Sequence, residues 1–287
     1  TLSGFSAANK VYDGNTSASV TIGSLNGLVG SETLNISTTN GNFDTKDVGN
    51  GKLVTVNLGL TDGTNGGLAS NYSAPTGTTT NADITPRNLQ LSSVSAADKV
   101  YDGNAVASLT LGSLSNLVGS ETLIASASGL FDSKDVGNNK AVAVTLNIAD
   151  GSNGGKASNY SAPPSPLTPA PRASITPATL TYNADPASKL VGAPLPAFSG
   201  TVNGFVAAEN QANATSGSLI FTSPASAASA AGQYAINGGG LSAANYNFVQ
   251  SPSNASALTV SGLSPADTAT EQENKSAQSL ALASVTP

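Results

Sequence analysis

Residues 54–60 read Val54-Thr55-Val56-Asn57-Leu58-Gly59-Leu60, an alternation of apolar residues with small or polar ones. Successive side chains of a β-strand point to opposite faces of its sheet, so a period of two predicts a strand with one buried face. The pattern returns at residues 142–148 as Val-Ala-Val-Thr-Leu-Asn-Ile. Residue pairs that favour tight turns separate such stretches: Asp13-Gly14, Asn26-Gly27, Asn40-Gly41 and Asp62-Gly63. We therefore expect an all-β protein.

Internal repeats set the domain organisation. Three motifs occur twice at a nearly constant offset: Val11–Asn15 with 100–104, Leu28–Leu34 with 117–123, and Phe43–Asn50 with 131–138. Diverged versions of two further motifs follow at 203–206 and 245–246. We expect a first module at 1–85, a second at 86–174 with a Pro-rich linker at 163–174, a third, diverged module at 175–262, and a polar, Ala- and Ser-rich tail at 263–287. Short strands divided by frequent turns predict three small β-sandwich modules, immunoglobulin-like or β-grasp-like, arranged as an elongated rod.

The composition excludes several classes of function. The 287 residues include no Cys and no His, so thiolate nucleophiles, Ser-His-Asp triads and Cys- or His-ligated metals are not possible. The net charge of −6 disfavours nucleic acid, because binding of phosphates requires clustered Lys and Arg. No apolar run approaches the ~20 residues of a membrane span. Only 10% of the residues are charged, which suits an extracellular β-protein.

Two motifs carry a resemblance to known modules. Lys10-Val11-Tyr12-Asp13-Gly14-Asn15-Thr16 and its copy at 99–105 resemble the YDG-type module. The third module is similar to the MBG-type module through Ile175–Ala178, Val202–Gly204, Gly232–Ile236 and Leu241–Tyr246. Arrays of such modules occur in filamentous-haemagglutinin-like bacterial surface exoproteins. The resemblance implies a stalk or adhesin segment at the cell surface and supplies no catalytic residues.

Repeated aromatic motifs are the first candidate site residues. Tyr12-Asp13-Gly14 and Tyr101-Asp102-Gly103 are interpreted as a buried tyrosine that anchors a strand, followed by an Asp-Gly turn. The other interpretation is a ligand-binding pair of an aromatic ring and an acid. Asn71-Tyr72, Asn159-Tyr160 and Asn245-Tyr246 form a second structural motif that all three modules share.

Acidic residues near Gly- and Asn-rich loops raise the question of calcium, the only candidate cofactor. Carboxylates three residues apart could bind Ca²⁺ through oxygen atoms, and the candidates are Asp44 and Asp47 with their copies Asp132 and Asp135, together with Asp62 and Asp150. No EF-hand spacing is present, and lysines stand between the acids. Aspartates that cap their own turn are the commoner arrangement.

Two further kinds of chemistry are weighed against the same residues. Paired acids suggest a glycosidase, but the chain has no Trp and few aromatic residues to form a sugar-stacking cleft. An acid pair repeated in each module also does not resemble a single active site. Lys10 and Lys99 could in principle form isopeptide crosslinks, for which no partner acid is identifiable. We therefore do not expect an enzyme.

The leading functional hypothesis is a non-enzymatic stalk segment of a secreted bacterial surface adhesin. It would project a binding region and mediate cell adhesion or biofilm contact, with other domains of a longer exoprotein, neighbouring copies of itself, or host and matrix glycans or proteins as partners. One alternative is a self-assembling extracellular fibre or matrix subunit that uses strand addition, since Thr1–Ser6 begins at a strand and the Ser279–Ser284 segment could donate one. The other alternative is a glycan-binding module.

Overall fold

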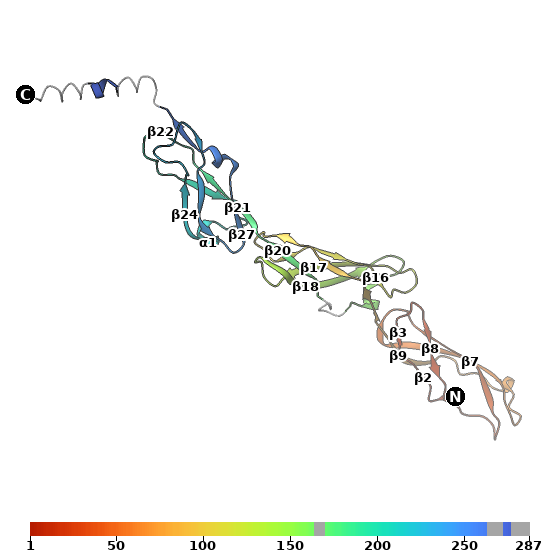
Figure 1. The fold of residues 1–287 in the computed structure, drawn as a ribbon. Coiled ribbons are helices and arrows are strands. Elements are labelled where there is room, and N and C mark those ends of the chain that lie inside the picture. The colour runs from red at the N-terminus through yellow and green to blue at the C-terminus, as the bar shows by residue number, and fades with distance from the viewer. Residues whose placement is uncertain (164–169, 263–271, 277–287) are drawn as a thin grey trace, which may run out of the picture. The chain divides into compact units, whose positions relative to one another are not determined.

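The computed structural model describes residues 1–163, 170–262 and 272–276. Strands dominate it, with short helical turns between them (Figure 1), so the all-β prediction is confirmed. Most of the predicted tail at 263–287, including the proposed donor strand Ser279–Ser284, and much of the Pro-rich linker lie outside the described residues. Within the described ranges, no helix is long and apolar enough to span a membrane.

Contacts divide the chain into two compact units. One unit holds residues 1–97, 107–130 and 142–172, and the other holds 98–106, 131–141 and 173–287. The division runs through the interior of the second module and not between modules. Each junction between successive modules therefore lies inside one compact unit.

The first module is built on one large sheet. Its elements are β1 (Leu2–Ser3), β2 (Ser6–Ala7), β3 (Lys10–Val11), β4 (Ser17–Ala18), β5 (Val20–Thr21), β6 (Ser24–Leu25), β7 (Leu34–Phe43), β8 (Gly49–Asp62), the 3₁₀ turn η1 (Ala69–Asn71) and β9 (Thr78–Thr85). The strand order of the sheet is β3-β9-β8-β7-β4. β7, β8 and β9 are antiparallel neighbours, and β3 joins the edge in parallel with β9 (Figure 1).

The alternating stretch lies in β8 as expected. Val54 and Val56 are at most 1% exposed, whereas the intervening Thr55 faces solvent. Two short antiparallel ribbons, β1–β6 and β2–β5, lie in the same module, and the second supplies Ala7 and Val20 to the core that these valines form. Because β1 pairs with β6 of the same chain, the strand expected at the start of Thr1–Ser6 already has a partner.

The second module repeats these elements and adds a pair of short strands, β10 and β19. They are β10 (Arg87–Asn88), β11 (Gln90–Leu91), β12 (Val94–Ala96), β13 (Lys99–Val100), β14 (Val106–Ala107), β15 (Leu109–Leu111), β16 (Leu114–Ser115), β17 (Leu123–Phe131), β18 (Gly137–Asp150), η2 (Ala157–Asn159), β19 (Tyr160–Ser161) and β20 (Arg172–Thr176). Within the first unit, β11–β16 and β12–β15 form antiparallel ribbons like those of the first module. Within the second unit, β13 runs parallel to β20, as β3 does to β9. β20 crosses the predicted module boundary between residues 174 and 175.

The third module arranges its strands differently. They are β21 (Ala178–Ala184), β22 (Ala187–Leu190), β23 (Gly200–Asn203), β24 (Ser216–Thr222), β25 (Gly232–Tyr234), β26 (Asn237–Ser242), β27 (Tyr246–Gln250) and β28 (Leu258–Ser261), with helix α1 (Gln211–Ala214) and turn η3 (Pro252–Ser256). β21 lies between β23 and β27, and β28 lies between β22 and β25. A core cluster of Ala225, Ile236, Leu258 and Val260 packs beside the second of these sheets.

Candidate functional site at the module junctions

The first junction centres on a buried glutamate of the second module. The hydroxyl of Tyr12, which follows β3, donates to Glu121 Oε1 over 2.6 Å. Tyr160 donates to the other oxygen, Oε2, over 2.7 Å. The Nζ atom of Lys46 lies 2.9 Å from Oε1. The Glu121 side chain is only 6% exposed, so a desolvated carboxylate is compensated by three donors, two of them from the first module.

Backbone and ring contacts fix these donors in place. The Tyr12 N–H donates to the Thr85 carbonyl at the end of β9, which ties the tyrosine to the sheet. The rings of Tyr12 and Tyr160 meet edge to face, with centroids 5.4 Å apart. The Tyr160 hydroxyl also accepts the Val118 N–H over 3.0 Å. The core cluster of the first unit accordingly runs from the first module into the second and includes Leu89 and Tyr160.

The glycine of the Tyr-Asp-Gly motif is required at this contact. Gly14 has φ +80°, and a Cβ atom built on it would lie 2.6 Å from Val118 Cγ1. A larger residue would therefore strain the backbone and push the two modules apart. Gly103 has φ +81°, and its Cβ would lie 3.1 Å from Ala207 of the third module.

A second set of contacts joins the loop after β7 to the end of η2. Asn159, which is 1% exposed, accepts the Val48 N–H over 2.9 Å and donates to Asp47 Oδ1 over 2.9 Å. Lys156 forms an ion pair with the other Asp47 oxygen at 2.6 Å. The Asn-Tyr motif of one module thus binds the Lys-Asp-Val loop of the module before it.

The second junction repeats this chemistry inside the second unit. Tyr101 and Tyr246 donate to the two oxygens of Glu209, each over 2.5 Å. Lys134 lies 2.8 Å from Glu209 Oε1. Asn245 accepts the Val136 N–H and donates to Asp135, as Asn159 does with Val48 and Asp47. The ring centroids of Tyr101 and Tyr246 are again 5.4 Å apart.

The electrostatics follow from burial opposed by hydrogen bonding. Burial raises the pKa of Glu209, but hydrogen bonds from Lys134, Tyr101 and Tyr246 outweigh burial and lower the pKa to about 2. Burial also raises the pKa of Glu121, and hydrogen bonds from Tyr12, Lys46 and Tyr160 again outweigh burial and lower it. Burial and hydrogen bonds to these glutamates raise the pKa values of Tyr160 and Tyr246 to about 12. Each junction therefore holds an ionised carboxylate between neutral tyrosines and a charged lysine.

The first module has counterparts of the glutamate, tyrosine and valine that the second module contributes to the first junction. Tyr72 donates to Glu32 Oε2 over 2.6 Å and accepts the Val29 N–H over 3.0 Å. In the part of the chain that the structure describes, no tyrosine or lysine from another module reaches Glu32. Asn71 is exposed there, whereas Asn159 is buried.

The aspartates of the calcium hypothesis do not converge. Asp44 forms an ion pair with Lys52, and Asp132 forms one with Lys140. Asp62 and Asp150 accept backbone N–H groups at η1 and η2, from Ala69 and Ala157 respectively. Asp47 and Asp135 contact the next module, as described above. Among residues 1–163, 170–262 and 272–276, no three acidic side chains are grouped so that they could hold a metal ion.

The lysines of the isopeptide hypothesis close the Asp-Gly turns. Lys10 Nζ lies 2.7 Å from Asp13 Oδ1 and 3.1 Å from Asn15 Oδ1, and it donates to two backbone carbonyls as well. Asp13 also accepts the Asn15 N–H. Lys99, Asp102 and Asn104 repeat these contacts. The lysines thus act as donors that fix the turn, and a covalent crosslink stays a prediction that intact mass can test.

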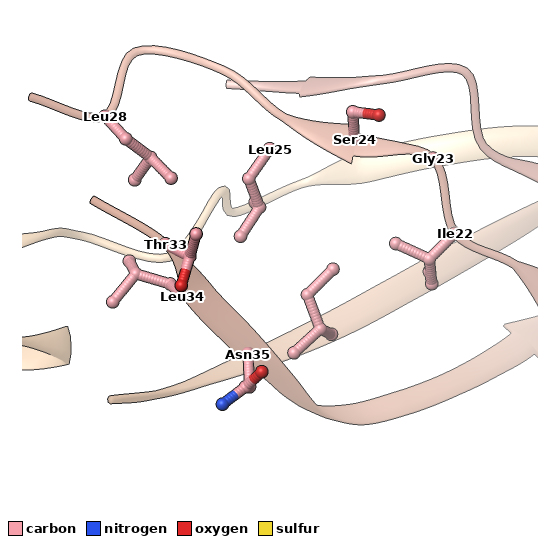
Figure 2. Close-up of a pocket in the computed structure, with 9 residues that line it drawn as sticks. Ile22, Gly23, Ser24, Leu25, Leu28, Thr33, Leu34 and Asn35 are labelled. Carbon is pink, nitrogen blue, oxygen red and sulfur yellow. The ribbon is translucent and has the colours of Figure 1, made fainter. Parts of the chain in front are cut away.

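The first module also has an open cleft, shown in Figure 2. Its cavity volume is about 440 Å³, and it lies where the ends of β6 and β7 approach each other. Side chains of Ile22, Leu25, Leu28 and Leu34 line it, and Ser24, Thr33 and Asn35 supply its labelled polar side chains. No titratable side chain lines this cleft among the described residues.

Sequence reasoning selected the tyrosines and asparagines of the junctions but missed the residues that join them. Glu121, Glu209, Lys46 and Lys134 were not selected. The signal was present, because Glu32 and Glu121 occupy one position of the repeated Leu-Val-Gly-Ser-Glu-Thr-Leu motif. Glu209 stands three residues after Val206, as Glu121 stands after Val118.

Comparison with known protein families gives two matches. Residues 1–81 and 85–168 each match the YDG domain, and residues 180–259 match the MBG domain of the YGX type. No curated protein and no solved structure shows a significant match. The resemblance to tandem YDG-type modules followed by an MBG-type module is thereby confirmed, while the setting of a surface adhesin stays a prediction.

Replacing Glu121 by Gln should destabilise the first unit by about 1–3 kcal/mol, because a buried tyrosine or lysine donor loses its acceptor. Glu32→Gln is the matched control, and it should change stability by less than about 0.5 kcal/mol, since within the described ranges Glu32 bonds only to Tyr72 of its own module. Urea unfolding followed by circular dichroism measures both. Equal effects of the two substitutions would show that the contribution of Glu121 to stability does not come from its contacts at the junction.

The junctions should also give the protein two pH limits. Both glutamates have lowered pKa values, so their contribution is present above the ordinary pKa of 4.5 and is lost as the pH falls below it, in the case of Glu209 toward its pKa of about 2. Tyr160 and Tyr246 have raised pKa values, so their contribution is present below pH 10 and is lost as the pH rises toward about 12. Melting temperatures measured across this range test the prediction. A variant with both Glu121→Gln and Glu209→Gln should show a weaker acid limb.

Proposed function

The chain belongs to the YDG-domain family, and from this membership and its junctions we propose that it is a non-enzymatic stalk segment of a secreted bacterial surface adhesin. In this role it projects a binding region and mediates cell adhesion or biofilm contact. The observation that supports the proposal best is the Tyr-Glu-Tyr-Lys cluster at both junctions, in which the tyrosines are buried. A spacer needs joints that keep their angle, and each cluster fixes the end of one module in the next.

The geometry suits a stiff connection. A simple flexible linker would leave few contacts across the boundary between modules. Here Tyr12 is fully buried where it meets the second module, and the strand β10 continues the connection by pairing with β19. Bending at this joint would expose the ion pair of Glu121 and Lys46 together with the ring of Tyr12. We therefore propose that the modules form an elongated rod.

The chemistry of the cluster favours a structural role for its acids. Glu121 and Glu209 are each held by two tyrosine hydroxyls and one lysine, so their oxygens are occupied by the protein itself. A general acid or base requires a carboxyl group that is free to exchange a proton with a substrate. The repetition of the same cluster in each junction also fits a joint better than a single active site.

The composition supports an extracellular setting. Stability comes from β cores and buried networks in a chain without Cys, so it does not depend on the redox state of the surroundings. Low charge and abundant Gly, Ser, Thr and Asn are consistent with exposed strands and turns. The proposed partners are other domains of a longer exoprotein, with host or matrix glycans and proteins contacted through the region that the stalk projects.

Small-angle X-ray scattering tests the rod. A compact chain of this length would have a radius of gyration of about 19 Å, whereas three modules in line would span about 100 Å and give about 30 Å. We expect the higher value, and we expect a broader distribution of distances for a variant with both Glu121→Gln and Glu209→Gln. A value near that of the compact chain would contradict the stalk.

Surface labelling tests the location. Antibodies raised against this chain should label intact cells of the source organism, while antibodies to a cytoplasmic protein should label only permeabilised cells. In-frame deletion of the segment should reduce attachment to surfaces without stopping export of the remaining protein. Labelling that requires permeabilisation would contradict the proposed location.

A further inference from the structure

The first module has a surface that corresponds to the surfaces by which the second and third modules bind the module before them. We define the socket of a module as its valine, glutamate and Asn-Tyr pair, which for the first module are Val29, Glu32 and Asn71-Tyr72. In the second and third modules, the corresponding glutamates each bind a tyrosine and a lysine from the preceding module. We propose that the Glu32–Tyr72 socket is a docking site for the Tyr-Asp-Gly end of another YDG-type module joined in series.

The socket is already formed. The hydrogen bonds from Tyr72 to Glu32 and from Val29 to Tyr72 have the same partners and nearly the same lengths as those from Tyr160 to Glu121 and from Val118 to Tyr160. One oxygen of Glu32 is thus held by its own module, as in the filled sockets. The other oxygen is the one that Tyr12 and Lys46 occupy on Glu121. Among the described residues, that second position at Glu32 has no donor.

The exposure of the socket residues shows what a docked module would cover. Val29 is 69% exposed, whereas Val118 and Val206 at the same position are half-buried. Tyr72 is half-buried, whereas Tyr160 and Tyr246 are no more than 6% exposed. An exposed valine beside a carboxylate fits a surface that takes up an apolar glycine turn together with a cation.

Backbone pairing shows the same difference. In the second module, β19 begins at Tyr160 and pairs in parallel with β10, the segment that connects it to the first module. In the third module, β27 begins at Tyr246 and pairs in parallel with β21. Tyr72–Ser73 is at the same position but forms no strand within the described residues. An extended segment leading from a docked module could pair with it.

The apolar cavities of the first module are at this end too. Leu114, Leu117 and Leu123 of the second module pack onto the core cluster that Leu89 and Tyr160 complete. Their counterparts Leu25, Leu28 and Leu34 instead line the cleft of Figure 2 and a smaller cavity that Thr1 and Tyr72 also border. The same leucines therefore lie in a continuous core where the socket is filled and beside open space where it is not.

The proposed occupant is a YDG-type module joined in series. A second copy of this chain does not fit, because the socket requires a tyrosine that is not already bound in a junction. Tyr12 and Tyr101 are both buried in this chain's own junctions. The third module has Val191 at the equivalent place, since its N–H donates to Ser261 as that of Tyr12 donates to Thr85. The chain therefore offers no free tyrosine for the socket of another copy among its described residues.

One position differs between the sockets. Leu68 stands where the second module has Lys156, so the ion pair from Lys156 to Asp47 is not reproduced in the first socket. This pair is not essential, because Asp135 at the second junction is held by Asn245. The docked module is thus expected to resemble the second junction in this detail.

The test adds a module in series and asks whether Glu32 acquires the role of Glu121. A duplicate of residues 1–89 is placed directly ahead of Thr1 in the full chain, because Thr1 corresponds to Gln90 and the insert must supply Leu89 of the junction core. Glu32→Gln in the original first module should then lower the melting temperature by about 2–4 °C, although it has little effect in the unextended chain. Tyr12→Phe in the added module only should remove most of that difference. If Glu32→Gln leaves the melting temperature of a folded extended chain unchanged, the proposed docking site is contradicted.

Hydrogen exchange gives a second readout. The amides of residues 29–33 and 71–73 should exchange about tenfold more slowly in the extended chain, since docking buries them. A duplicate of residues 90–180, which contributes Tyr101 and Lys134, replaces the first insert if that insert does not fold. Unchanged exchange in both extended chains would contradict the proposal. In sedimentation the unextended chain should remain a monomer, and a dimer abolished by Glu32→Gln would instead identify a second copy as the occupant.

The outcome is independent of the stalk proposal. The socket rests on the geometry of the junctions, whereas the stalk rests also on a cell-surface location. Surface labelling can fail while the extended chain still shows docking.

Discussion

A buried carboxylate that no single module can satisfy is the constraint on which the rest of the structure depends. Glu121 is nearly enclosed, and one of its oxygens is bound by Tyr12 and Lys46 of the preceding module. Leaving a desolvated charge without partners is far more costly than forming the pair. The glutamate therefore selects one orientation of its neighbour, because a small rotation would move both donors out of reach.

This constraint explains why the compact units do not coincide with the sequence repeats. Tyrosine rings, the Val118 side chain and the Asn159 amide fill the space around the carboxylate, so the core of the first unit continues across the junction. The third module has a different strand arrangement and still supplies Glu209, Asn245 and Tyr246 to the same contacts. The contacts at the two junctions are thus more alike than the strand arrangements of the modules that they connect.

Part of the candidate site could be predicted from sequence. Repetition selected Tyr12, Tyr101 and the Asn-Tyr pairs, and the glycine after Asp13 indicated a tight turn. Repetition could not show that Tyr12 binds a glutamate more than one hundred residues away, since the partners in a junction belong to different repeats. Asp47 was considered as a calcium ligand because its neighbours in sequence are visible, whereas Lys156 and Asn159 come close only in the folded chain.

The sequence by itself determined the β-strands, the turns and the tandem YDG and MBG modules, because the period of two and the repeated motifs are local properties of the chain. Tertiary structure alone decided which acids pair with which lysines and that the junctions are packed. It also decided that the socket at Glu32 and Tyr72 differs from the two others, since no tyrosine or lysine of another module reaches Glu32 among the residues that the structure describes. These outcomes depend on burial and on contacts between distant residues, and burial turns an ordinary glutamate into the residue that orients one module on the next.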